Sequence, residues 1–276
     1  MITPDPRAMQ SERLVFVGGG NMAGAILGGL LGAGRAREGV VVVEPHAPQA
    51  ALVRERFGVQ VEAAGGPALR GATTVVWAVK PQVFAAAAPP CAPFVRDALQ
   101  VSVMAGVRSA TIAAATGSER IVRTMPNTPA LIGQGIAGLF ARPAVTAADR
   151  ATVEALLAPT GQTLWVAQEA DLDAVTALSG SGPAYVFYFV EAMMQAAVEM
   201  GLDAAQGRQL ALATFRGATA LAETSGEAPE TLRARVTSKG GTTHAAITTM
   251  DALGVKEAIV KALHAAQERA RELGQG

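Results

Sequence analysis

The chain has 276 residues, half of them hydrophobic, and its 23 basic and 23 acidic side chains leave no net charge. This length allows two domains, and without a basic run the composition gives no indication of nucleic acid binding. No uninterrupted apolar stretch reaches the ~20 residues of a membrane span, and residues 1–12 lack the apolar segment of a secretory signal. We therefore expect a cytoplasmic protein with a loose tail at 1–12. The single cysteine, Cys91, excludes an intrachain disulfide, and we interpret it as a small apolar packing residue rather than a nucleophile.

Residues 14–31 predict the first half of a βαβ unit. An apolar, β-branched run at 14–17 is typical of a buried parallel strand, and glycines then lead into apolar residues at helical spacing. The spacing Gly18-x-Gly20-x-x-Ala23 matches the dinucleotide fingerprint. Gly18 permits a sharp turn, Gly20 leaves room for a pyrophosphate, and Ala23 keeps the helix close to the strand. We expect the N–H groups at the helix start to face a dinucleotide, although a plain tight turn would use the same glycines.

Three polar side chains follow later strands. Glu44 ends an apolar strand, where it either accepts hydrogen bonds from the adenine ribose 2′-OH, which favours NAD, or is simply solvated. Lys80 also follows a buried strand, and ligands bind beyond the carboxyl ends of strands, so it either meets the coenzyme or is an ordinary surface lysine. Asn127 lies in a loop stiffened by two prolines and offers the donor and acceptor that a nicotinamide carboxamide requires.

Strand patterns end at Val166, and helices dominate from there to the end of the chain. We predict strands at 14–17, 40–44, 59–61, 73–79, 101–106 (with its turn), 121–125, 136–140 and 164–166. We predict helices after the first glycine loop and at 50–57, 111–116, 147–157, 171–178, 184–200, 203–222, 244–253 and 255–273. The expected fold is an α/β Rossmann domain at 13–167, with a doubly wound, mostly parallel sheet, and an all-helical domain at 168–276.

The predicted helix at 184–200 is apolar on nearly every side. Such a helix must be covered on every side, and about a hundred residues can hardly surround it. We therefore expect a partner subunit to cover one face, the alternative being the central helix of a monomeric bundle.

A second glycine loop, SKGGTT at 238–243, also precedes a helix. Its glycines permit successive N–H groups to converge on an anion, and Thr242 or Thr243 can cap the helix. One small carboxylate would suit this loop, although a loop with an ordinary N-cap has the same residues.

An acid–base pair is not evident, since His244 and His264 lie on predicted helices without paired carboxylates, and no metal-ligand cluster is present in the sequence. A hydride-transfer enzyme whose substrate is an already protonated imine would need little proton chemistry. A positioned hydroxyl need only orient the imine nitrogen.

The segments VGGGNMAGAI (17–26), AVKPQ (78–82), MAGV (104–107), RTMPNTP (123–129), ALSGSGPAYVF (177–187) and VTSKGGTT (236–243) together resemble pyrroline-5-carboxylate reductase. The resemblance extends from Leu14 to the last helix. It implies a Rossmann domain followed by an all-helical dimerisation domain, in a homodimer that assembles into a decamer of five dimers. It also implies the reduction of L-1-pyrroline-5-carboxylate to L-proline by NADPH or NADH.

The resemblance also assigns site residues. It implies a coenzyme site at Gly18, Gly20, Asn21, Met22, Ala23, Glu44, Ala78, Val79, Lys80, Pro81, Ala105, Asn127, Gly180, Ser181 and Gly182. It implies a substrate site at Ser238, Gly240, Gly241, Thr242 and Thr243, with Thr243 as the catalytic hydroxyl that meets the ring nitrogen.

Departures from the family pattern leave the coenzyme preference open. Many members have proline at the place of Lys239, asparagine at Gly65-Gly66, and serine, asparagine or arginine near Glu44. Two other classes compete with a reductase of this kind. A β-hydroxyacid dehydrogenase would need a lysine on the long helix, and 184–201 contains none. A non-catalytic nucleotide sensor would not need the second glycine loop.

Overall fold

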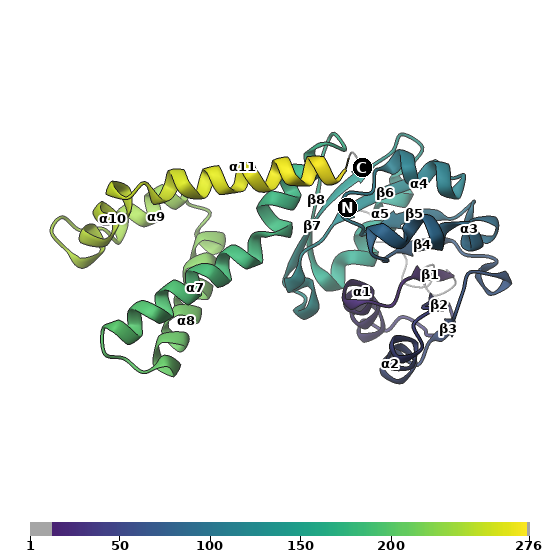
Figure 1. The fold of residues 1–276 in the computed structure, drawn as a ribbon, viewed down its shortest axis with the longest axis horizontal. Coiled ribbons are helices and arrows are strands. Elements are labelled where there is room, and N and C mark those ends of the chain that lie inside the picture. The colour runs from purple at the N-terminus through teal and green to yellow at the C-terminus, as the bar shows by residue number, and fades with distance from the viewer. Residues whose placement is uncertain (1–12, 275–276) are drawn as a thin grey trace. The chain divides into compact units, whose positions relative to one another are not determined.

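The computed structural model describes residues 13–274, so the tail predicted at 1–12 lies outside the described residues (Figure 1). Contacts between residues divide the chain into two compact units. The first contains residues up to Ser181 together with the chain from Ala266 onward, and the second is Gly182–Ala265. The sequence boundary near Gln168 is placed where strand patterns end, whereas this division follows the contacts between residues. The boundary near Gln168 therefore stays a prediction.

The first unit is built on a sheet whose eight described strands have the order β3-β2-β1-β4-β5-β6-β7-β8. These strands are β1 (Leu14–Val17), β2 (Val40–Val43), β3 (Gln60–Glu62), β4 (Thr74–Trp77), β5 (Leu99–Ser102), β6 (Ile121–Met125), β7 (Gly135–Ala141) and β8 (Gly161–Trp165). The six strands β1 to β6 are mutually parallel, β7 is antiparallel to β6, and β8 is parallel to β7. This confirms the doubly wound, mostly parallel sheet, in which the strand order reverses between β1 and β4.

Helices cover both faces of the sheet (Figure 1). Leu14 and Phe16 point into one apolar core with α1 (Asn21–Gly32), α2 (Ala47–Phe57) and α5 (Ala147–Leu157). Val15 and Val17 point into the other core with α3 (Phe84–Val95) and α4 (Ser109–Thr116). Successive strand residues face opposite sides. A strand buried on both sides therefore reads as a continuous apolar run, as β1 does.

Helix α3 is not among the predicted elements, because three prolines fall inside it, at positions 89, 90 and 93. Proline lacks the N–H that a helix interior uses, so the sequence disfavours a helix there. The structure nevertheless buries Phe84, Ala88, Cys91 and Val95 at helical spacing against the sheet. Burial of this apolar stripe outweighs the lost hydrogen bonds.

Cys91 is completely buried in the α3 core. Desolvation by burial raises the pKa of its thiol to about 11, so the interpretation as an apolar packing residue is confirmed. Gly65 packs directly on it, since a Cβ at Gly65 would lie 2.6 Å from the Cys91 sulfur.

The second unit is helical in all of its described secondary structure. It contains α7 (Gly182–Glu199), α8 (Ala204–Ser225), α9 (Pro229–Arg235), α10 (Thr242–Ala252) and the larger part of α11 (Val255–Leu273). Helices α7 and α8 pack together, with the rings of Phe189 and Phe215 at 6.4 Å. Helix α9 is absent from the sequence prediction. None of the described helices is long and apolar enough to cross a membrane.

Large apolar side chains of α7 are exposed within the single chain. Phe187 is 59% and Tyr188 72% exposed. Beside them, an apolar groove of about 320 Å³ lies between α7 and α11, lined by Tyr185, Tyr188, Phe189, Val255, Ala258, Ile259, Ala262 and Leu263. The helix predicted to be covered on every side is therefore left partly uncovered by its own unit.

Candidate functional site

The residues assigned to the coenzyme, apart from those at 180–182, follow five adjacent parallel strands. In the spatial order β2, β1, β4, β5 and β6, they are Glu44, the loop 18–23, the segment 78–81, Ala105 and Asn127. Because parallel strands end at one edge of a sheet, these residues form a row along the carboxyl edge, centred where the strand order reverses. Gly20, Asn21, Lys80 and Ala105 are exposed there.

Gly18 brings the glycine loop into contact with the next strand. Its φ of 101° lies in the region that favours glycine, and a Cβ there would lie 2.6 Å from the carbonyl oxygen of Ala78. Gly18 N–H also donates to Val43 O at 2.8 Å. The loop is thus held between β2 and β4, so that Ala78 and Val79 lie beside it.

Gly20 is the N-cap of α1 and makes no side-chain capping bond. A Cβ at Gly20 would meet no atom within 4 Å. The first N–H groups of a helix have no partner within the helix and attract anions. An exposed, uncapped helix start beside open space fits the pyrophosphate of a dinucleotide. Asn21, Met22 and Ala23 form the first turn behind it.

The Glu44 carboxylate takes part in the loop structure. Its Oε2 accepts a hydrogen bond from the Gly19 N–H at 2.9 Å, and its Oε1 accepts one from the His46 N–H at 2.9 Å. The interpretation of Glu44 as a simply solvated strand end is therefore wrong. Each oxygen keeps a second lone pair for a ribose hydroxyl, and that contact stays a prediction.

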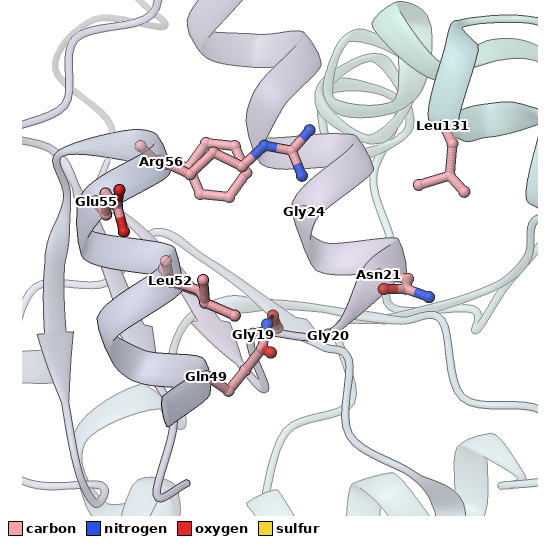
Figure 2. A pocket seen from close by; sticks show the side chains of 11 residues that line it. Gly19, Gly20, Asn21, Gly24, Gln49, Leu52, Glu55, Arg56 and Leu131 are labelled. Carbon is pink, nitrogen blue, oxygen red and sulfur yellow. Dashed lines mark hydrogen bonds between the residues drawn. The ribbon is translucent and has the colours of Figure 1, made fainter. Parts of the chain in front are cut away.

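Sequence reasoning did not identify Gln49, in the first turn of α2. Its Nε2 donates to the Gly19 carbonyl oxygen at 2.6 Å (Figure 2). Both residues line a cleft of about 570 Å³ along α1 and α2. No sequence signal marks Gln49, since a polar residue near a helix start is common.

Asn127 bridges two segments near the end of β6. Its Nδ2 donates to Ser179 O at 3.2 Å, and its Oδ1 accepts from the Ile136 N–H at 3.0 Å. The side-chain amide keeps one N–H and one lone pair for a ligand. Contact between Asn127 and the nicotinamide carboxamide stays a prediction. The two hydrogen bonds to Ser179 and Ile136 give Asn127 a structural role that the sequence did not predict.

The GSG segment follows an unusual turn. The predicted helix at 171–178 is α6 (Asp171–Val175) continued by a π-helix at Thr176–Gly180. The Ser181 N–H closes it by donating to Thr176 O at 2.8 Å. A Cβ at Gly180 would lie 2.6 Å from Cε of Met125, the flexible end of a β6 side chain, so this turn packs closely on β6. Single π-helical turns are frequent at functional sites.

A charged cluster anchors the segment that leads into this turn. Glu169 accepts hydrogen bonds from the Ser109 N–H (2.6 Å) and hydroxyl (2.7 Å), and pairs with Arg123 at 2.8 Å. Burial alone would raise the pKa of Glu169, but the bonds from Ser109 and Arg123 outweigh it and leave the pKa lowered. Burial lowers the pKa of Arg123 despite that pairing.

The second glycine loop lies in the second unit. Gly240 has a φ of 77°, and the Gly241 N–H donates to Ser238 O at 3.0 Å. Gly241 itself is the N-cap of α10 and offers no side-chain bond. The prediction that Thr242 or Thr243 caps the helix is therefore wrong, because they are its first two residues. A helix start without a side-chain cap fits a small carboxylate.

The described residues include no cluster of three or more His, Cys, Asp or Glu side chains that could hold a metal ion.

The fold and the carboxyl-edge geometry define a two-part protein with a Rossmann unit suited to a dinucleotide. Residues 13–106 match the family "NADP oxidoreductase coenzyme F420-dependent", and residues 169–273 match "Pyrroline-5-carboxylate reductase dimerisation". The chain is 40% identical to the Pseudomonas aeruginosa pyrroline-5-carboxylate reductase, over 97% of this chain and 98% of that protein.

Solved structures of pyrroline-5-carboxylate reductases are similar to this chain as well. The enzyme of Coxiella burnetii is 33% identical with a TM-score of 0.89, covering 95% of this chain and 98% of that one. The Plasmodium falciparum enzyme, solved with NADP bound, is 27% identical with a TM-score of 0.85, covering 96% of this chain and 99% of that one. The chain belongs to the pyrroline-5-carboxylate reductase family.

Proposed function

We propose that this protein reduces L-1-pyrroline-5-carboxylate to L-proline, the last step of proline synthesis, with NADPH or NADH as reductant. The observation that carries the proposal is the match to the Pseudomonas aeruginosa reductase over 97% of this chain. The reaction consumes one imine, one hydride and one proton. The reduced nicotinamide, when bound, supplies the hydride to C5 of the protonated cyclic imine.

The coenzyme would lie along the carboxyl edge of the sheet. The free N–H groups behind Gly20 would bind the pyrophosphate, and Glu44 the adenine ribose. The nicotinamide end of the coenzyme would lie near the segment 78–81, Ala105, Asn127 and the GSG residues 180–182. A carboxylate near the ribose repels a 2′-phosphate, so we expect unusually good use of NADH alongside NADPH.

The second glycine loop would bind the substrate. N–H groups at Gly240 and the start of α10 would hold its carboxylate, with the Gly241 backbone and the hydroxyls of Ser238 and Thr242 beside them. The Thr243 hydroxyl would accept the hydrogen bond of the ring N–H and so orient C5. The substrate arrives protonated, so the protein need not supply an acid at this nitrogen.

For assembly, we propose a homodimer that combines further into a decamer of five dimers in the cytoplasm. The exposed apolar side chains of α7 and the groove beside them support self-association. The match of residues 169–273 to a dimerisation family supports it as well.

Turnover of pyrroline-5-carboxylate with NADH and NADPH tests the proposed reaction. Production of proline, matched by coenzyme oxidation, is the expected result. Oxidation of a small 3-hydroxy acid instead would favour a β-hydroxyacid dehydrogenase. Coenzyme binding without turnover of either compound would favour a nucleotide sensor.

The role of Thr243 is tested by two substitutions. Thr243→Val keeps the shape and removes the hydroxyl, so it should lose one hydrogen bond to a charged partner, ~1.5–3 kcal/mol, or about ten- to hundredfold in kcat/KM. Thr243→Ser should retain most activity. Since Gly241 is the N-cap, neither change removes a cap. A stable Val variant with the activity of the original chain would contradict the catalytic role.

A further inference from the structure

Gly19, a buried residue in the middle of the glycine loop, is held from two sides by side chains. Its N–H donates to Glu44 Oε2 at 2.9 Å, and its carbonyl oxygen accepts from Gln49 Nε2 at 2.6 Å. Glu44 follows β2, and Gln49 belongs to the first turn of α2. Figure 2 shows the Gln49 side chain extending from α2 to Gly19. Both polar groups of a buried residue are thereby satisfied without secondary structure.

The hydrogen bond from Gln49 to the Gly19 carbonyl also sets the direction in which the Gly20 N–H points. The carbonyl of Gly19 and the N–H of Gly20 belong to one planar peptide group, and the described residues contain no cis peptide bond. In a trans peptide these two groups point in opposite directions. Because the carbonyl points at Gln49, the Gly20 N–H points away from α2. Gly20 is exposed and begins α1, where the pyrophosphate is expected.

Three consecutive glycines would otherwise leave this loop mobile, since glycine loses more conformational freedom on ordering than any other residue. Glu44 fixes only the peptide group between Gly18 and Gly19. Gln49 fixes the following one. A loop that is ordered before the coenzyme arrives avoids the entropic cost of ordering during binding.

We propose that Gln49 is a positioning residue of the coenzyme site, which holds the Gly19–Gly20 peptide group so that the Gly20 N–H is directed at the pyrophosphate. This inference rests on the proposed function, because it takes the dinucleotide as the ligand. The competing explanation is a purely structural link, in which Gln49 fastens α2 to the loop and affects only stability.

The test compares Gln49→Met with a matched control, Gln60→Met. Methionine has nearly the length of glutamine but no donor, and the exposed Gln60 amide donates to Glu62 on the same strand. For each variant, NADH affinity is measured by fluorescence titration without substrate, together with the Tm of the coenzyme-free protein. Steady-state kinetics then give KM for NADH, KM for pyrroline-5-carboxylate, and kcat.

We expect Gln49→Met to raise the Kd for NADH about three- to tenfold, the equivalent of one net hydrogen bond. KM for NADH should rise with it, while kcat at saturating coenzyme and KM for the imine stay unchanged. Gln49→Glu should bind NADH more weakly still, because a carboxylate can only accept and would face the Gly19 carbonyl. Gln60→Met should match the original chain.

An unchanged Kd in folded Gln49→Met would overturn the proposal. So would a lowered Tm of the coenzyme-free protein with an unchanged Kd for the folded fraction, which is the result of a purely structural link. If Gln49→Met does not fold, Gln49→Ala is measured in the same way and judged by the same criteria. If the original chain binds neither NADH nor NADPH, the proposed function fails first, and the two failures are thereby distinguished.

Discussion

Substitution of Gly20 by valine is a sharp test of the coenzyme loop, because the structure separates its effect on folding from its effect on binding. Gly20 has φ −75° and ψ −170°, an extended conformation that valine adopts readily. A Cβ there meets no atom within 4 Å. The remaining cost is the poorer N-cap, about 1 kcal/mol. Gly20→Val should therefore fold with only a modest loss of stability.

Coenzyme binding should respond very differently. The isopropyl group would occupy the open space next to the helix start and keep the pyrophosphate away from the N–H groups. Losing two hydrogen bonds to a charged group, at ~1.5–3 kcal/mol each, weakens binding by at least about a hundredfold. Fluorescence titration with NADH measures this loss, and urea unfolding measures stability.

Two further substitutions complete the comparison. Gly32→Val, at the other end of α1 and also in open space, should change neither property. Gly18→Ala should instead destabilise the fold by roughly 2–4 kcal/mol, since it combines a strained φ with a clash against Ala78 O. A folded Gly20→Val variant that binds NADH with the original affinity would refute the assignment of this loop.

Three other outcomes are expected. Glu44→Ser should raise the ratio of kcat/KM for NADPH to that for NADH; an unchanged ratio would leave Glu44 only its bonds to the Gly19 and His46 N–H groups. Sedimentation at micromolar concentration should show no stable monomer, because α7 exposes Phe187 and Tyr188; a monomeric boundary would contradict self-association. The pKa of Glu169 is lowered on folding, so its stabilising contribution is present above about pH 4.3 and is lost as pH falls through the folded value. Glu169→Gln should unfold at lower urea than the original chain at pH 7, with the difference shrinking toward pH 3; an equal difference at both pH values would contradict this.

The sheet could be predicted from the sequence because its strands are buried on both faces and read as apolar runs between turns. The strand order follows from the βαβ pattern, and the glycine spacing locates the first loop. Helix α3 was missed because local proline penalties opposed the prediction, although Phe84, Ala88, Cys91 and Val95 do have helical spacing. The helical spacing of these four residues was the sequence signal that could have predicted α3.

The polar details of the site could not be predicted in the same way. The bond between Gln49 and Gly19 joins residues 30 positions apart, and the bond between Asn127 and Ser179 joins residues 52 apart. Such contacts depend on how helices and loops meet in three dimensions, and one side chain leaves no periodic pattern. The cap of α10 was assigned to the threonines for a related reason, since residue preference favours a hydroxyl over the glycine that is used.

The burial of Cys91 has a practical consequence for labelling experiments. Thiol reagents attack the thiolate, and a completely buried thiol with a pKa of about 11 presents almost none at neutral pH. Because it is the only cysteine in the chain, the folded protein should resist maleimides until it unfolds. A cysteine introduced on the exposed surface of α7 would then be the sole reactive thiol, and a fluorophore attached there could report subunit association directly.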